Sequence, residues 1–324
     1  MTQAGTTFIV TVDTEEDDWN GGRSIGSPVS NVERVPAFQT LCDRYGIRPT
    51  YLLTYPITQD GEAARLFRGL AGKGVCEIGL HCHPWNTPPF EEDLTPANSM
   101  LCNLPADLQV KKIQTLGRAI HKAVGVQPVS FRAGRWAYSA QIAQHLVALG
   151  YRVDSSITPY VDWTHQHGPD FTDYPLHPYR VQPSNIQAPV ADGALLEIPA
   201  TIGLLGWSSP LAERIWKAIA KGNLAVFKGT GLLATLGIVQ KVWLSPEVVD
   251  GPTMIRLIAQ LRRQGHHCFN MVFHSSSLKA GLTPFVRTVE EESRLLQRME
   301  AVFRYVRSEG IRPMTLTEAG LDYE

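Results

Sequence analysis

Acidic and imidazole side chains stand where two short apolar segments end, and their types could support metal chemistry. Asp13 and Glu15 follow a segment rich in Val, Ile, Phe and Thr, and His81 and His83 follow a second apolar segment. Alternate residues of an extended chain point to the same side, so the two imidazoles face one way. A carboxylate and two imidazoles hold a divalent metal ion and leave it open coordination positions. This spacing predicts a metal site suited to hydrolysis.

Three further polar residues follow later apolar segments: Arg132, Asp154 and His274. In metal-assisted hydrolysis a second carboxylate serves as the base, and a separate histidine protonates the departing amine. Each residue taken alone also has an ordinary structural explanation. An acid after a strand is often a loop charge, and Arg132 with Asp154 would make a buried ion pair.

The elements that must position these residues alternate along the chain between strand composition and helical periodicity, which is typical of a parallel sheet. The expected strands are 7–12, 50–53, 76–80, 129–132, a short one near 153, 195–199, 269–273 and 313–317, and the expected helices are 35–45, 63–73, 110–124, 140–149, 254–264 and one between 288 and 310. In a β/α barrel the groups that follow the strands share one rim. We therefore expect an α/β barrel that brings all of these candidates together.

Two irregular stretches, residues 84–105 and 156–194, are expected as long loop insertions over one face of the barrel. No linker-like segment divides the chain, so we expect a single domain of residues 1–324. Trp85 begins the first insertion and Trp136 follows Arg132 closely. These two aromatic side chains are expected to contact a substrate. A plain surface excursion remains the alternative for residues 84–105.

The ordered set of segments resembles the polysaccharide deacetylases of carbohydrate esterase family 4, the NodB homology group, and more closely its cytoplasmic branch with an Asp-Thr-Glu first motif. The five matching segments, which occur in family order, are residues 12–19, 77–85, 131–134, 153–156 and 272–274. The resemblance implies a deformed (β/α)7 barrel of the TIM-like kind. It also implies hydrolysis of an N-acyl group, most simply N-acetyl, on an amino sugar or glycan precursor.

Site roles follow from the resemblance residue by residue. It implies that Asp13 is the base, that Arg132 holds and tunes Asp13, and that Glu15 and His81 are metal ligands. It further implies that Asp154 orients His274 and that His274 protonates the leaving nitrogen.

The second imidazole ligand departs from the family pattern. That family spaces its two metal histidines four residues apart, and Trp85 stands four residues after His81. His83 takes the role by proximity alone. Zinc is the expected ion, because it suits imidazole and carboxylate ligands, although Co, Ni, Mn or Fe would accept the same set.

Two other functions remain open on the sequence. One is a non-catalytic carbohydrate-binding protein on a degenerate deacetylase barrel. The other is an amidohydrolase-type metal hydrolase, which also uses a His-x-His pair. That class places the pair after its first strand, whereas the first strand here is followed by acids.

Composition narrows the partners and the compartment. The 30 basic and 31 acidic residues give a net charge of −1, which disfavours nucleic-acid binding. Five cysteines without regular spacing favour a reducing compartment. The first residues lack a signal-like pattern and no apolar stretch is long enough to cross a bilayer, so we expect a cytoplasmic protein. The basic, partly apolar segment 205–244 could rest on a membrane surface, although an ordinary outer helix is the favoured interpretation.

Overall fold

The computed structural model describes residues 5–17, 26–206, 213–214, 216–218 and 239–323. Within this part, nine strands form one curved sheet: β1 (Thr7–Thr14), β2 (Thr50–Leu53), β3 (Glu77–Cys82), β4 (Ser130–Ala133), β5 (Val153–Asp154), β6 (Tyr179–Val181), β7 (Leu195–Glu197), β10 (Cys268–His274) and β11 (Arg312–Pro313). Their order is β10-β1-β2-β3-β4-β5-β7-β6, with β11 beside β1. Every pairing is parallel except that of β6 with β7.

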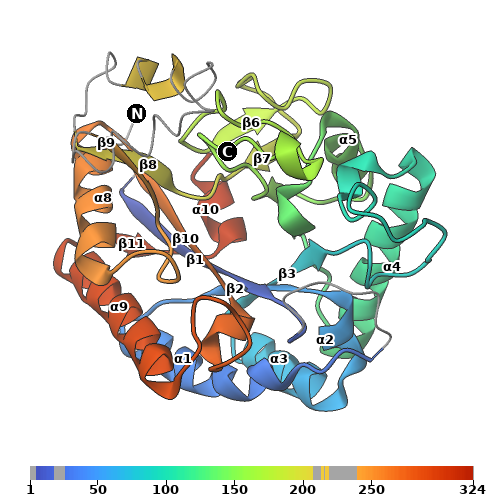
Figure 1. The fold of residues 1–324 in the computed structure, drawn as a ribbon, viewed down its shortest axis with the longest axis horizontal. Coiled ribbons are helices and arrows are strands. Elements are labelled where there is room, and N and C mark those ends of the chain that lie inside the picture. Colours follow the sequence, from blue (N-terminus) through green and yellow to red (C-terminus); the bar gives the residue numbers. More distant parts are fainter. Residues whose placement is uncertain (1–4, 18–25, 207–212, 215, 219–238, 324) are drawn as a thin grey trace.

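Helices follow one another around the outer side of this sheet (Figure 1). They are α1 (Val35–Arg44), α2 (Tyr55–Gln59), α3 (Gly61–Gly72), α4 (Ala106–Val124), α5 (Ala140–Ala148), α8 (Gly251–Arg263) and α9 (Val289–Ser308). Local sequence explains their ends: the Thr288 side chain accepts a hydrogen bond from the Glu291 backbone at the start of α9, and Gly125 ends α4 in the left-handed conformation. The curved sheet with its outer helices confirms the predicted deformed barrel.

Strand alternation divides the buried residues between two environments. On β1, Phe8, Val10 and Val12 pack with the helices in the main core, whereas Ile9 faces the barrel interior. A small apolar cluster fills one end of that interior, and α10 (Leu316–Leu321) lies against it. Its buried members are Ile9, Leu52, Val153, Leu196, Ile198, Cys268, Leu316 and Ala319. The interior is therefore closed and apolar near the amino ends of the strands, which leaves the carboxyl ends for polar residues.

The predicted strand 313–317 is wrong. Only Arg312–Pro313 pairs with β1, and Leu316 already begins α10. Thr315 and Glu318 form a reciprocal capping box, in which each side chain accepts a hydrogen bond from the other residue's backbone. This local motif turns the chain into a helix.

An antiparallel pair, β8 (Ile202–Gly206) with β9 (Val239–Trp243), was not predicted from the sequence. It begins where the chain after β7 meets β10, since the Thr201 backbone N–H donates to the Asn270 carbonyl oxygen over 3.1 Å. Most of the basic segment 205–244 lies outside the described residues, so the favoured outer helix and the alternative of a membrane contact both stay hypotheses. No described helix is both long and apolar enough to cross a membrane.

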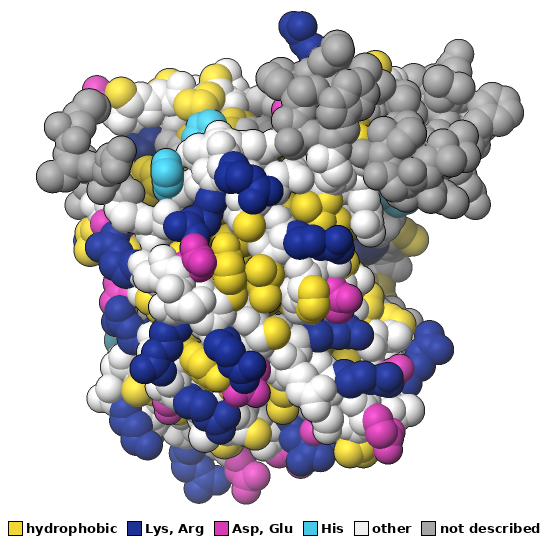
Figure 2. Space-filling model, turned by 90° about the vertical axis from the view of Figure 1, so that its left-hand side faces the viewer, with side chains coloured by type: hydrophobic (Ala, Val, Ile, Leu, Met, Phe, Trp, Pro, Cys, Tyr) yellow, Lys and Arg dark blue, Asp and Glu magenta, His cyan; other side chains and the backbone are white. Residues whose placement is uncertain are grey.

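The outer face over α8 and α9 carries basic and acidic side chains interspersed with small apolar areas (Figure 2). Arg262 of α8 pairs with Glu309 just beyond α9 over 2.7 Å. Charges of both signs on one face are typical of a solvated helix surface.

Candidate metal centre and catalytic site

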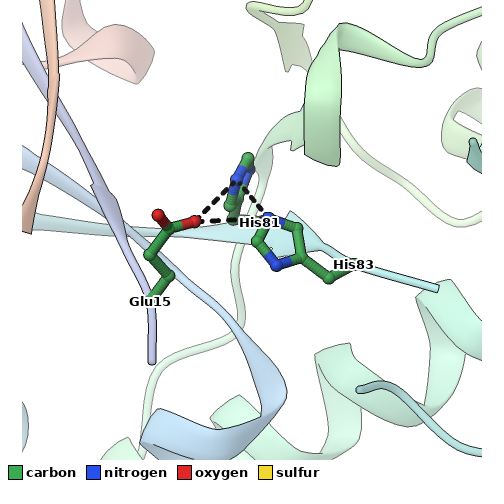
Figure 3. Close-up of side chains that lie close together, drawn as sticks. All are labelled: Glu15, His81 and His83. Carbon is green, nitrogen blue, oxygen red and sulfur yellow. Dashed lines mark hydrogen bonds and ion pairs between the residues drawn. The ribbon is translucent and has the colours of Figure 1, made fainter. Parts of the chain in front are cut away.

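Glu15, His81 and His83 converge at the carboxyl ends of β1 and β3 (Figure 3). Glu15 follows β1, His81 lies on β3, and His83 directly follows that strand. The His81 Nε2 and His83 Nε2 atoms are 3.0 Å apart, and Glu15 Oε2 lies 3.9 Å from the first and 3.4 Å from the second. All three side chains are buried, so the group is a compact set of metal-ligating atoms in a low-dielectric setting.

Hydrogen bonds fix which ring nitrogen of each imidazole faces the group. His81 Nδ1 lies 3.1 Å from the Arg132 carbonyl oxygen, which only accepts, so Nδ1 carries the proton. His83 Nδ1 lies 3.5 Å from Glu16 Oε1, which likewise accepts its proton. The two Nε2 atoms face each other and the Glu15 carboxylate. Burial lowers the pKa of His83, but its hydrogen bond with Glu16 and the charges of Glu16 and Glu15 outweigh burial and raise that pKa, so in the metal-free protein the protonated His83 Nε2 donates to His81 Nε2. A divalent ion can take the place of that proton between the three ligand atoms, so these residues fit a bound metal ion.

Glu16 is a buried acid that supports the ligand His83. Its carboxylate accepts hydrogen bonds from Asn86 Nδ2 over 2.7 Å and Thr54 Oγ1 over 3.2 Å. Burial raises the pKa of Glu16, but its hydrogen bond and charge interaction with His83 outweigh burial and lower the pKa to about 2. An ionised Glu16 orients the imidazole and makes it a stronger ligand.

Burial raises the pKa of Glu15 to about 7 in the metal-free protein, and the neighbouring Glu16 and Asp13 charges act in the same direction. For His81, burial lowers the pKa to about 3, which keeps this imidazole neutral as a ligand must be. Both shifts have the same cause, because a dry pocket disfavours charge. A divalent ion would restore the ionised form of Glu15.

Asp13 points from β1 into the same pocket and is held by Arg132 of β4. Arg132 Nη1 donates to Asp13 Oδ1 over 2.6 Å, while Asp13 Oδ2 lies 3.9 Å from His81 Nε2 and 4.0 Å from His274 Nε2. Burial raises the pKa of Asp13, but Arg132 and the two histidines outweigh it and lower the pKa to about 2. Asp13 is therefore ionised, with one oxygen fixed and the other available to the pocket.

Arg132 is fully buried, and a polar network holds its guanidinium. Nε donates to the Ser155 carbonyl oxygen, and Nη2 donates to Thr11 Oγ1 and Ser155 Oγ, each over 2.8 Å. Asn270 Nδ2 donates in turn to Ser155 Oγ over 3.0 Å. Strands from opposite parts of the sheet thus fix the arginine that fixes Asp13.

His274 ends β10, which lies beside β1 with Asp13 and His274 in register. Glu247 accepts hydrogen bonds from the His274 backbone N–H and from Nδ1, at 3.1 Å each. Burial lowers the pKa of His274, but Glu247 and Glu15 outweigh it and raise the pKa to about 10. The imidazole is therefore protonated, and its Nε2 faces the pocket beside Asp13, which suits a general acid.

The expectation that Asp154 orients His274 is wrong, and Glu247 occupies that role. Val153 faces the apolar barrel interior, so the next residue, Asp154, points to the opposite side of β5. There its carboxylate accepts from Ser156 Oγ over 2.7 Å and lies beside Glu197, its register partner on β7. Burial raises the pKa of both carboxyl groups, and the Asp154 charge raises the pKa of Glu197 further, so Glu197 holds the proton that the pair shares.

One pocket of about 610 Å³ is lined by the three-ligand group, Asp13 and His274. Trp85 stacks on the ring of His83 at a centroid distance of 4.1 Å, and Trp136 lies over the Arg132 guanidinium at 5.0 Å. Both expected aromatic residues therefore line the same pocket as the metal group. Part of the first insertion also lines it, through residues 94–96 and Ser99.

A tight approach between strands shapes this pocket. A Cβ atom on Gly134 would lie 2.3 Å from His83 Cδ2 and 2.7 Å from the Cys82 carbonyl oxygen, so only glycine fits. The next two residues, Arg135 and Trp136, adopt φ angles of 54° and 60°. Left-handed conformations cost about 1–3 kcal/mol per non-glycine residue and concentrate at functional sites.

Two functional residues had no assigned role in the sequence analysis. Glu16 belongs to the acidic run after β1, and the alternation of side chains along an extended chain was the available signal. Glu15 faces the two imidazole ligands, whereas Glu16 contacts the other ring nitrogen of His83. Glu247 follows Ser245 and Pro246 in a segment without a motif. Nothing in its local sequence indicates that it meets His274.

Known protein families and curated proteins give no match to the sequence. Solved structures do match. A protein from Parabacteroides distasonis named as a glycoside hydrolase/deacetylase superposes with a TM-score of 0.63 at 11% identity, covering 98% of this chain and 71% of that one. The 4-alpha-glucanotransferase of Thermococcus litoralis gives 0.55 at 12% identity, with 98% and 40% covered. A protein from Mycobacterium smegmatis named as a polysaccharide deacetylase gives 0.47 at 18% identity, with 98% and 96% covered. At these identities the likeness to the Parabacteroides distasonis and Thermococcus litoralis proteins shows a shared fold and no more.

Proposed function

We propose that this chain is a metal-dependent hydrolase that removes an N-acyl group, most simply acetyl, from an amino sugar or glycan precursor. The observation that carries the proposal is one pocket holding a three-ligand group, an ionised Asp13 and a protonated His274. Amide hydrolysis needs an electrophile, a base and an acid that protonates the leaving amine, and these groups supply all three.

Glu15, His81 and His83 would hold the ion, with zinc the first choice for one carboxylate and two imidazoles. When bound, the ion polarises the acyl carbonyl and acidifies a water molecule. Asp13 Oδ2 accepts the proton of the attacking water, while Arg132 keeps that carboxylate ionised and in place. His274 Nε2 donates a proton to the leaving nitrogen as the carbon–nitrogen bond breaks, and Glu247 holds the imidazole protonated.

A sugar substrate suits the pocket lining, because Trp85 and Trp136 offer aromatic faces on which a pyranose ring packs. Membership of the cytoplasmic branch with the Asp-Thr-Glu first motif, and the cytoplasmic location itself, stay predictions. The choice of acetyl over formyl likewise stays a prediction.

Metal content of the purified protein tests the proposal first. We expect about one equivalent of a transition metal in the parent and none in His81→Ala/His83→Ala, measured by elemental analysis. Asp13→Asn should keep the metal and lose about 10²–10⁴-fold in turnover of acetylated amino sugars, because a positioned base contributes that much. A parent that binds no zinc even after soaking would instead support the non-catalytic carbohydrate-binding protein.

A further inference from the structure

Arg135 is a pocket-lining cation that the proposed chemistry does not use. It follows Gly134, where the His83 ring fills the space that a Cβ atom would need, so the backbone of Arg135 lies beside the metal group. The left-handed backbone at Arg135 and Trp136 accompanies two side chains that both line the pocket. The protein therefore holds a guanidinium in the cavity beside the metal group, although this requires an unfavourable backbone conformation.

The partners of Arg135 are neutral. Its guanidinium donates to Ser99 Oγ, and Nη2 donates to Gln166 Oε1 over 3.0 Å. Among the described residues, no carboxylate forms an ion pair with it. Burial lowers the pKa of Arg135, with no acid acting against it. Since a guanidinium has five N–H donors, donors remain after these two contacts.

The fully buried cations of the described chain, Arg132 and Lys112, have acidic partners, whereas the half-buried Arg180 and Lys241 donate to backbone carbonyl oxygens outside the pocket. Arg132 pairs with Asp13 over 2.6 Å, and Lys112 pairs with Glu92 over 3.1 Å. A half-buried charge without a counterion is unfavourable, and an anionic ligand would supply the missing partner. Arg135 is thus poised for a negative group that arrives with the substrate.

We propose that Arg135 binds an anionic group of the substrate, so that the enzyme acts on acylated amino sugars that carry a carboxylate or a phosphate. This inference rests on the proposed function and adds the substrate class. Guanidinium binds both oxyanions through paired N–H donors, so the two sources share one recognition chemistry.

A purely structural role makes a different prediction. Ser99 lies in the insertion 84–105 and Gln166 in the insertion 156–194, so Arg135 could serve only to tether these loops. Loss of a tether would weaken the binding of every sugar alike. Loss of an anion site weakens the binding of charged sugars only.

The test compares three probes: N-acetylglucosamine, which is neutral, N-acetylglucosamine 1-phosphate and N-acetylmuramic acid. Dissociation constants are measured by calorimetry on zinc-loaded Asp13→Asn protein, which should bind these sugars without hydrolysing them. We expect at least one anionic probe to bind about tenfold or more tightly than the neutral one, as for a charge-assisted hydrogen-bonded contact. The probe that shows the preference identifies phosphate or carboxylate as the source.

Arg135→Gln should bring the ratio of the dissociation constants of the neutral and the anionic sugar close to one. It should leave the dissociation constant of the neutral sugar unchanged. Arg135→Lys should retain part of the preference. Arg180→Gln is the matched control, because Arg180 is also half-buried but donates to the carbonyl oxygens of Tyr323 and Gly193 outside the pocket. Thermal melting of each variant separates a folding defect from a binding effect.

Three results would overturn the inference: equal affinities in the parent background, equal weakening of all three sugars by Arg135→Gln, or no binding of either anionic sugar. Failure of the proposed function looks different. If the protein binds no zinc and hydrolyses no sugar but still prefers anionic sugars through Arg135, the anion site is supported and the hydrolase function is rejected. If the protein hydrolyses acetylated amino sugars but shows no preference for anionic ones, the hydrolase function is supported and the anion site is rejected.

Discussion

The proton on His274 distinguishes its imidazole from that of His81, although both lie near Asp13 in one pocket. Burial lowers the pKa of His81 to about 3, and its Nδ1 is committed to a backbone carbonyl. His274 also experiences burial, but the Glu247 carboxylate at Nδ1 raises its pKa to about 10. One imidazole is therefore a neutral ligand and the other an acid, because their Nδ1 partners differ in charge.

Glu247→Gln should lower the pKa of His274, since it removes the main charge that raises it. The acid would then lose its proton at lower pH, so the alkaline limb of the pH–rate profile should move to lower pH. The profile of kcat, together with an NMR titration of the His274 ring, measures both effects. Turnover at pH 6 should fall much less than turnover at pH 9, because the remaining acid is still protonated at the lower pH.

Asp154→Asn is the control for that experiment. Asp154 lies on the other side of β5 and has no contact with His274 in the described structure, so the alkaline limb should stay in place. A shift of the limb by Asp154→Asn, with none by Glu247→Gln, would restore the role that the sequence resemblance implied for Asp154.

The alternation of side chains between the two faces of a strand explains which site residues could be predicted from the sequence. Asp13, His81 and Arg132 lie near the carboxyl ends of strands whose inward-facing positions the apolar pattern identifies. Asp154 fails because β5 has only two residues, too short for alternation to show which side faces inward. Glu247 reaches the site through tertiary packing, which leaves no periodic signal.

At the level of elements, the close approach of the segment after β4 to the segment after β3 sets the geometry of the ligands. Gly134 permits that approach, because the space for a Cβ is already filled by His83 and by the Cys82 backbone. The longer strands and helices were predictable because their apolar residues repeat at fixed intervals. The β8–β9 pair was not, since it depends on a contact between distant segments.

Gly134→Ala should displace His83 and weaken zinc binding about 10–100-fold, comparable to the loss of a residue that orients a ligand. Competition with a chromophoric chelator measures the affinity. Unchanged zinc affinity in a folded Gly134→Ala protein would contradict the importance of this close contact.

Gly69→Ala provides the matched substitution. Gly69 lies within α3, where nothing is within 4 Å of an added Cβ. It should leave zinc affinity unchanged and stabilise the fold by about 0.5–1 kcal/mol, the usual gain for alanine over glycine in a helix. Urea denaturation measures this gain.

For the whole molecule, the barrel interior is graded from apolar to charged. The α10 helix and its apolar cluster close one end, the Thr11, Ser155 and Asn270 side chains form a neutral polar layer around Arg132, and the ionisable groups occupy the other end. The scaffold must bury several carboxylates at that end. Global stability therefore depends on pH and on the metal ion.

Metal-free protein should lose stability as the pH rises from about 4.5 to about 7, because the pKa of Glu15 is raised to about 7 by folding. A group with a raised folded pKa contributes stability that is complete below its unfolded pKa and lost through its folded pKa. The loss amounts to about 3 kcal/mol at most. Glu15→Gln should lack this component of the pH dependence.

Urea denaturation at pH 5 and pH 8, with chelator and then with zinc, measures the difference. In chelator at pH 8, Glu15→Gln should be the more stable protein. With zinc the order should reverse, because the carboxylate is then a ligand. If the parent is as stable as Glu15→Gln at pH 8 without metal, ionisation of the buried Glu15 does not destabilise the fold.

The pairing of β1 with β10 joins residues 7–13 to residues 268–274. Glu15, His81 and His83 are all synthesised early, together with the strands that carry them, whereas Glu247 and His274 are synthesised near the end. Contacts between such distant segments form late in folding. On the proposed function, a chain still lacking residues 247–274 lacks both the acid His274 and the Glu247 that keeps it protonated, so the order of synthesis places the completion of the active site at the end.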